Sequence, residues 1–188
     1  MCGSILKEYL IQFKPFLVFL SKFALSYLIL TFIYQSYLNQ FDAKSNQVDG
    51  FTQLVARQSQ QVLSLFDAHS YTQPNTNEPS VKLFYHDKWV ARIIEGCNAL
   101  SVIVLFISFV IAFTGKFQKT VFFVLIGSVI VHIFNILRIA LLCVSIYHYP
   151  KWEHILHGVI FPLIIYGIVF LLWVLWVNKY SFYAKKSS

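Results

Sequence analysis

The chain has 188 residues, of which 57% are apolar and only 12% are charged, and 19 are phenylalanine. A soluble domain carries roughly twice that share of charged residues, so the composition excludes an ordinary soluble protein and favours one compact membrane domain. A formal net charge of +7 would by itself favour nucleic-acid binding, but the positions of the lysines point to membrane orientation instead.

Four apolar segments are each long enough to span a membrane, which takes about 20 helical residues. They run over about 16–38, 97–114, 120–147 and 154–177. The expected fold is an all-α integral membrane protein with four transmembrane helices in a single domain, 1–188. The first segment has no small-residue cleavage site after it, so we expect it to stay in the membrane as an anchor.

Lysines in the short flanks of these segments predict the orientation, because cytoplasmic flanks are enriched in positive charge. They precede the first segment, occupy the link between the second and third, and follow the fourth: Lys7, Lys14, Lys116, Lys119, Lys179, Lys185 and Lys186. Four alternating spans place all of these on one side. We therefore predict that both termini are cytoplasmic and that residues 39–95 are extracytoplasmic.

The segment 39–95 is the only sizeable aqueous part. Apolar residues recur at helical spacing over about 48–66, and the polar stretch Thr72–Ser80 has the composition of a loop. Val81–Tyr85 and Trp89–Ile93 then predict two short strands that form a hairpin leading into the second apolar segment.

Cys97 stands in Glu95-Gly96-Cys97-Asn98-Ala99, at the predicted N-terminus of the second transmembrane helix. Unpaired backbone N–H groups at a helix N-terminus favour an anion and would stabilise a thiolate. Small apolar filler is the commoner role of a membrane cysteine. Cys2 and Cys143 form neither a CxxC pair nor a metal-type spacing with it, so we predict no disulfide framework or zinc site and structural or incidental roles for both.

Arg138 lies within the third predicted helix, where a charge costs on the order of 3 kcal/mol even on a lenient insertion scale. If the helix emerges near Ser145–Tyr147, Arg138 is about 10–14 Å below the outer surface, which it can approach by snorkelling. Asn135 is one turn deeper on the same face, where it either holds the guanidinium or lines the same cavity. An arginine that simply reaches lipid headgroups is the alternative, and the polar Asn135 argues against it.

His157 lies about one turn inside the fourth predicted helix, and His154 shares its face nearer to water. Taken singly, His157 fits a buried, hydrogen-bonded histidine equally well, and His154 fits an interfacial one. The order Glu153-His154-x-x-His157 differs from the zinc-protease motif and lacks a third ligand, so no metal is predicted. Haem is disfavoured too, because His132 lies about 9 Å deeper than Arg138. No cofactor is expected.

The alternating topology brings Cys97, Arg138 and His157 into one leaflet on three different helices, and we expect them to face one cavity. Their side chains supply a nucleophile, a clamp for an oxyanion and a general acid/base. These are the functional groups that a cysteine transferase or protease uses.

Three blocks together resemble the exosortase/archaeosortase family of membrane cysteine transpeptidases: Glu95-Gly96-Cys97-Asn98-Ala99, Asn135-Ile136-Leu137-Arg138-Ile139 and His157 at the start of an apolar helix. The family carries an E-x-C block at a helix start, an N-x-x-R block on the next helix and a histidine on the one after. The resemblance covers roughly residues 80–177. The short length and His157–Pro162 look most like the short exosortase F branch. The chain departs at Asn98-Ala99, where many members have Ser-Gly, and in its four spans, where many have up to eight.

The resemblance implies a thiol protease or transpeptidase of the bacterial cytoplasmic (inner) membrane, with its active site at the outer face. Its substrates would be exported proteins with a C-terminal sorting signal, which consists of a short motif, a transmembrane helix and a basic tail. In this interpretation Cys97 forms a thioester, Arg138 with Asn135 stabilises the oxyanion, and His157 is the acid/base. Glu95 matches the family's first block as a supporting residue.

Two other classes stay open on the residues alone. One is a non-enzymatic membrane scaffold or assembly subunit, in which Arg138 binds a lipid phosphate or an acidic residue of a partner. The other is a small transporter component, which is expected to show Gly/Pro-broken helices or matched halves. The second and third predicted helices show neither. No nucleic-acid partner is predicted.

Overall fold

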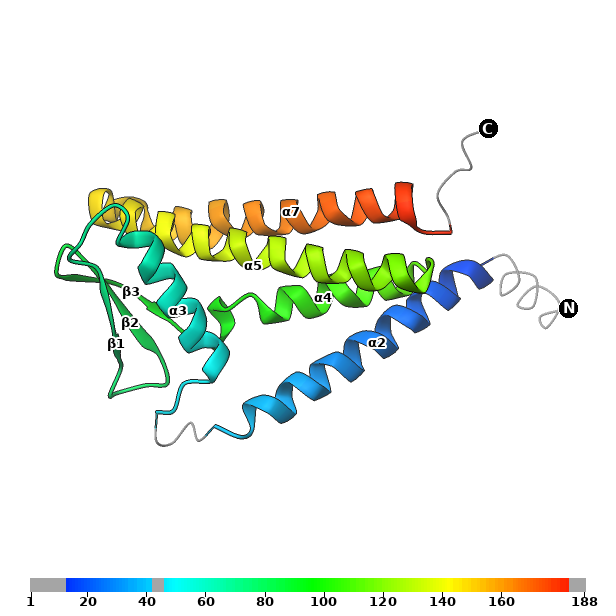
Figure 1. Ribbon diagram of the computed structural model, residues 1–188, viewed down its shortest axis with the longest axis horizontal. Helices are drawn as coiled ribbons and strands as arrows, with labels where there is room; N and C mark the ends of the chain where they lie inside the picture. The colour runs from blue at the N-terminus through cyan, green and yellow to red at the C-terminus, as the bar shows by residue number, and fades with distance from the viewer. Residues whose placement is uncertain (1–12, 42–45, 183–188) are drawn as a thin grey trace, which may run out of the picture.

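The computed structural model describes residues 13–41 and 46–182. The chain is mainly helical, and a small three-stranded sheet lies at one end of a bundle of long apolar helices (Figure 1). Cys2 and three of the lysines behind the orientation prediction lie outside the described residues, namely Lys7, Lys185 and Lys186.

Among the described residues, three helical stretches are long and apolar enough to cross a membrane. They are α2 (Lys14–Leu38), α5 (Phe117–His148) and the stretch Pro150–Tyr180. No residue of α2 is buried within the protein, as expected of a helix that faces lipid. The 32 residues of α5 measure about 48 Å, which exceeds the roughly 30 Å of a hydrocarbon core, so α5 extends beyond that core.

The last stretch is not a uniform α-helix. A short helix α6 (Glu153–Ile155) leads into a wide π turn at Leu156–Ile160, and α7 (Phe161–Leu175) follows. The π turn ends two residues before Pro162, which has no N–H and whose ring would clash with the carbonyl of Gly158 in a regular α-helix. A second π turn, Trp176–Tyr180, ends the stretch.

Helix α4 is shorter than the transmembrane helix predicted over 97–114, so a fourth spanning helix is not shown among the described residues. It comprises only Leu100–Ala112, 13 residues or about 20 Å, which is short of the roughly 30 Å core. The helix starts late because Ala99 has a left-handed backbone with φ 65°, and the side-chain oxygen of Asn98 accepts the first helical N–H at 2.9 Å. At its other end the backbone leaves the helix at Phe113.

Although short, α4 is central to the half of the bundle that lies away from the sheet. It packs against α2, α5 and α7. Gly127 on α5 makes room for Phe106, since a Cβ at that glycine would lie 2.3 Å from the ring. The Trp176 indole donates to the Phe113 carbonyl at 2.8 Å. The buried members of this core are Ala99, Ile103, Phe106, Val110, Val131, Val169 and Trp176.

The segment between α2 and α4 forms a small α/β unit, which we call the cap. It contains α3 (Gly50–Leu63) and the antiparallel strands β1 (Tyr71–Pro74), β2 (Val81–Tyr85) and β3 (Lys88–Ile93), in the order β1-β2-β3. The predicted β2–β3 hairpin is confirmed. Strand β1 was not predicted, because its proline marks it as loop. A proline is nevertheless tolerated in an edge strand such as this one.

The cap packs onto one end of α5. Tyr147 of α5 lies against the Tyr85 ring at 5.3 Å and the His86 ring at 5.0 Å, and the Lys88 ammonium lies 5.2 Å from its centroid. One buried apolar cluster joins α3, the sheet and α5: Val55, Ala56, Leu63, Val81, Leu83, Tyr85, Ile93, Ile139, Ala140 and Cys143. Cys143 is thus a packing residue of this cluster.

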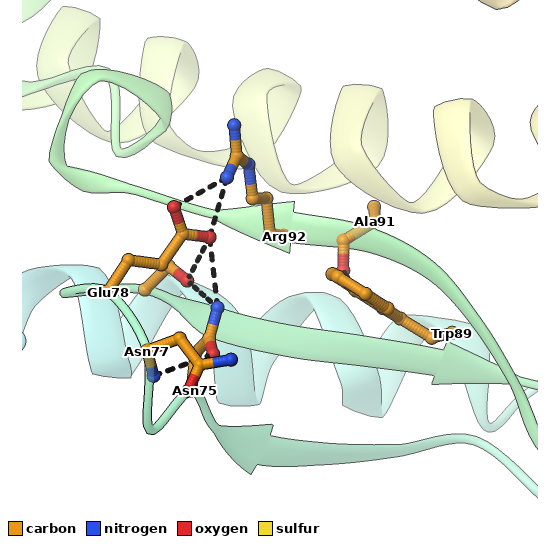
Figure 2. A network of polar contacts seen from close by, with 7 residues as sticks. Asn75, Asn77, Glu78, Trp89, Ala91 and Arg92 are labelled. Atoms are coloured by element: carbon orange, nitrogen blue, oxygen red, sulfur yellow. Dashed lines mark hydrogen bonds and ion pairs between the residues drawn. The ribbon is translucent and has the colours of Figure 1, made fainter.

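A polar network at the exposed side of the sheet holds Arg92 of β3 (Figure 2). One guanidinium nitrogen of Arg92 donates to both carboxylate oxygens of Glu78, at 2.6 and 2.5 Å. Asn75 and Ser80 donate to the same carboxylate at 2.9 and 3.1 Å. The hydrogen bond from Arg92 is the main cause that lowers the pKa of Glu78. The network orients Arg92, and its exposure makes it a small contributor to stability.

Candidate active site

Cys97 lies in a 3₁₀ turn, Glu95–Cys97, between β3 and α4. The prediction that it opens the second transmembrane helix is wrong, because α4 begins three residues later, at Leu100. The field of a helix terminus falls off within its first turn, so α4 does not supply the predicted stabilisation of a thiolate. The thiol is half-buried, and Cys97 packs against the cluster that joins the cap to α5.

Glu95, the first residue of this turn, and Asn98, which follows it, anchor it to other helices. The Tyr34 hydroxyl of α2 donates to a Glu95 carboxylate oxygen at 2.5 Å. The buried Asn98 amide donates to the Thr52 hydroxyl of α3 at 3.0 Å. Glu95 therefore joins the cysteine turn to α2, a role that its place in the sequence motif does not reveal.

Asn135 and Arg138 lie one turn apart on α5. Asn135 is completely buried, and its amide nitrogen donates to the Cys97 carbonyl at 2.9 Å. Its oxygen accepts a hydrogen bond from Arg138 at 3.3 Å. Asn135 thus holds the guanidinium, the first of its two expected roles, and also the backbone of the cysteine. The Nε of the half-buried Arg138 is itself buried and has no hydrogen-bond partner among residues 13–41 and 46–182.

His157 lies in the π turn Leu156–Ile160, where the N–H of Phe161 bonds back to the Leu156 carbonyl. A π turn widens the helix locally, and such turns are frequent at functional sites. The imidazole is exposed, as is that of His154. The alternative of a buried, hydrogen-bonded histidine is therefore excluded for His157.

Cys97, Arg138 and His157 line one cavity of about 270 Å³. Three different segments contribute them: the 3₁₀ turn, α5 and the π turn. Asn135 lies beneath the cavity, bonded to both Cys97 and Arg138, and Glu95 is not among the residues that line it.

Two charged residues of the cavity did not emerge as candidates from the sequence, namely Arg92 of β3 and Glu153 of α6. Arg92 was hidden within a predicted strand. Glu153 was noted only as part of a motif that failed as a zinc site. Arginine and glutamate are common on protein surfaces. Only the packing of the hairpin and of the turn before α6 against α5 brings these two to the cavity.

The remaining histidines lie elsewhere. His154 lines a neighbouring open cavity of about 570 Å³ together with Glu153 and His157. His132 is on α5 with its Nε2 2.8 Å from the Gln58 side chain and its ring against Phe51. Within the described residues, no three His, Cys, Asp or Glu side chains are grouped as metal ligands would be.

The arrangement combines a thiol, a guanidinium and an imidazole around one space. A thiol can form a covalent acyl intermediate, a guanidinium can stabilise a developing oxyanion, and an imidazole can transfer protons near neutral pH. The chemistry that this set supports is acyl transfer through a thioester at the edge of an apolar helix bundle.

A sequence model that describes the transmembrane exosortase family matches residues 9–177. The chain therefore belongs to the transmembrane exosortase family. Membership makes it a multi-pass membrane protein of a transpeptidase-like family linked to exported proteins with C-terminal sorting signals. No curated protein and no solved structure shows significant similarity to the chain.

Proposed function

We propose that this protein is a membrane cysteine protease or transpeptidase that cleaves the C-terminal sorting signals of exported proteins, and that it belongs to the short F branch of its family. One observation supports this most strongly. Cys97, Arg138 and His157, three residues distant in sequence, line the same cavity in a chain of the exosortase family.

In the proposed reaction the Cys97 thiolate attacks the scissile carbonyl carbon, and Arg138 stabilises the oxyanion. The unpartnered Nε of Arg138 supports this role, because a buried donor without a partner is costly and an oxyanion would satisfy it. His157 protonates the leaving amine as the C–N bond breaks, which leaves a thioester on Cys97. An amine or water then attacks the thioester and gives a proton to His157, and the C–S bond breaks to return the Cys97 thiolate.

The proposed membrane position puts this chemistry at the outer face. A span of about 20 residues that starts at the beginning of α5, next to Lys116 and Lys119, ends near Arg138. The rest of α5 then projects from the membrane and carries the cap. In this arrangement the chain crosses four times, and the short α4 completes its crossing with flanking irregular backbone buried in protein.

Labelling of engineered cysteines tests this topology. In a variant without native cysteines, an impermeant maleimide added to intact cells is expected to label a cysteine at Asn77, on the exposed side of the cap. A cysteine at Ser187 should react only after the cells are permeabilised, because the lysines retain the C-terminus in the cytoplasm. Labelling of Ser187 but not Asn77 in intact cells would invert the orientation.

Arg138→Lys is expected to lower cleavage by about 10²–10³-fold, the usual cost of losing one oxyanion donor. A lysine keeps the charge but loses the planar fork that can bond Asn135 and an oxyanion together. The measurement is the rate of reporter cleavage at equal membrane abundance. Arg57→Lys, the same change at an exposed position of α3, is the control and should cleave at the wild-type rate.

Capture of the covalent intermediate tests the proposed function directly. Membranes that contain the protein and an exported reporter with a C-terminal sorting signal are quenched with acid, and Cys97 is examined by mass spectrometry. An acyl adduct on Cys97 that hydroxylamine removes is expected. Reporter cleavage with no such adduct, and with Cys97→Ala fully active, would favour the scaffold alternative, in which another protein cleaves.

A further inference from the structure

The candidate cavity has two long walls. One is formed by five consecutive residues, Val90–Ile94, at the end of β3, and the other by one face of α5 with Arg138, Leu142 and Ile146. Successive side chains of a strand point to opposite faces, so a cavity on one face of the sheet would contact only alternate residues. Val90 lies at a bulge, where alternation is broken, but the four residues after it, Ala91 to Ile93 and the extended Ile94 beyond β3, also line the cavity in succession. This is the pattern of a cavity that runs along the edge of the strand. We call this space the trench.

The two walls have the same length. The extended chain from Val90 to Ile94 advances by four residues, which is about 13 Å at 3.3 Å per residue. Helix α5 advances by eight residues from Arg138 to Ile146, which is about 12 Å at 1.5 Å per residue. A trench of this length accommodates about four residues of extended chain.

The strand that forms one wall is at the edge of its sheet. Within the described residues the strand order is β1-β2-β3, and β3 pairs with β2 alone. The other side of an edge strand presents N–H and C=O groups that lie outside the ladder, which is the usual template for adding a peptide strand. One backbone group of β3, the Ala91 carbonyl, accepts a hydrogen bond from the Trp89 indole at 3.0 Å, and an added strand would share or displace that bond if it used this carbonyl. The side chain of Arg92, a residue of this strand, is oriented by Glu78 (Figure 2).

The trench leads to the candidate nucleophile. Beyond Ile94 the chain turns directly into Glu95–Cys97, and Cys97, Arg138 and His157 line the same cavity. The walls between are mainly apolar, and Ile93 and Leu142 are both buried. An extended chain bound there would therefore carry small or apolar side chains and would place its next carbonyl beside Cys97.

We propose that the trench binds the substrate segment immediately before the scissile bond as an added strand, parallel to β3. The direction follows from the topology: β3 runs toward Cys97, and a substrate likewise runs from its exported domain toward its membrane helix. This inference rests on the proposed function and names the form of substrate that the site takes, an extended apolar peptide of about four residues.

Filling the trench tests the proposal. Ile146→Trp, at the half-buried end farthest from Cys97, is expected to raise the KM for the reporter at least 10-fold and to leave kcat within about 2-fold, because the thiol is untouched. Leu141→Trp is the matched control, since Leu141 is exposed on another face of α5 and outside the trench. An unchanged KM in Ile146→Trp, with an intact Cys97 adduct, would overturn the trench and leave the proposed function standing.

Cross-linking gives a second reading that does not depend on turnover. In the Cys97→Ala background, a photoreactive phenylalanine at Ala91 of β3 is expected to capture the reporter within four residues before the scissile bond. The same residue at Gln73 of β1, on the opposite edge of the sheet, should not. Two outcomes would contradict the added strand. One is a cross-link from position 73 and none from position 91, and the other is a cross-link from position 91 to the membrane helix of the reporter only.

Discussion

Cys97→Ala is expected to abolish cleavage of the sorting signal and to leave the protein inserted and folded. The side chain is small and half-buried, and the turn that carries it is anchored by its neighbours: Glu95 bonds to Tyr34 and Asn98 to Thr52. The buried Asn135 holds the Cys97 backbone carbonyl, which alanine keeps. Loss of the thiol therefore removes the nucleophile and little else.

Cys97→Ser should be nearly as inactive, because a hydroxyl lacks the accessible anion that makes a thiol reactive. Cys143→Ala is the control. Cys143 is buried in the cluster between α5 and the cap, so its loss affects packing and leaves the cavity intact. The measurement is reporter cleavage at equal membrane abundance. Wild-type cleavage by Cys97→Ala would end the enzyme proposal and leave the scaffold, for which Arg138 alone matters.

Much of the secondary structure follows from local patterns in the sequence. Long apolar runs predicted α2, α5 and α7, helical spacing predicted α3, and alternation about His86-Asp87 predicted the β2–β3 hairpin. These elements are specified by the spacing of apolar residues and by the residue types at turns, and both can be read from residues that are close together in the sequence. No residue of α2 is buried within the protein, so this helix could be predicted from its own apolar sequence without knowledge of a packing partner.

Features that depend on distant partners were not predictable. The 13-residue α4 is set by the left-handed Ala99, which carries no glycine signal, and by the Asn98 cap beside α3. Strand β1 pairs with β2, and Tyr71 stacks on Phe84 across this pairing with ring centroids 4.6 Å apart. No pattern within residues 71–74 predicts this partner. Tertiary context overrides local propensity at such positions.

The candidate site likewise has a part that the sequence predicts and a part that depends on packing. Cys97, Arg138 and His157 could be selected from their residue types and their order along the chain. The bond from Asn135 to the Cys97 carbonyl, and the presence of Arg92 and Glu153 in the cavity, depend on how β3 and α6 pack beside α5. A sequence pattern identifies reactive groups, whereas the walls that position a substrate are formed only by packing.

His157→Ala is expected to slow formation of the Cys97 thioester by about 10²–10⁴-fold, the usual range for a positioned acid/base. The imidazole is exposed and lines the cavity from a π turn, so its removal leaves no hole in a core. Folding and membrane abundance should therefore match those of the wild-type protein. Without His157 the amine would have to leave without a proton donor. Cleavage of the C–N bond would then limit the rate of acyl transfer.

The neighbouring His154 provides the matched control. It is an exposed histidine of α6 that lines only the adjoining open cavity, so His154→Ala should form the thioester at close to the wild-type rate. Acylation is followed by rapid quenching and quantification of the Cys97 adduct. A reporter whose leaving group needs no proton, such as a thioester at the scissile position, should recover most of the rate in His157→Ala. If His157→Ala and His154→Ala acylate equally fast, His157 is not the acid, and the proton must come from another group at the cavity, of which Glu153 is the nearest in sequence.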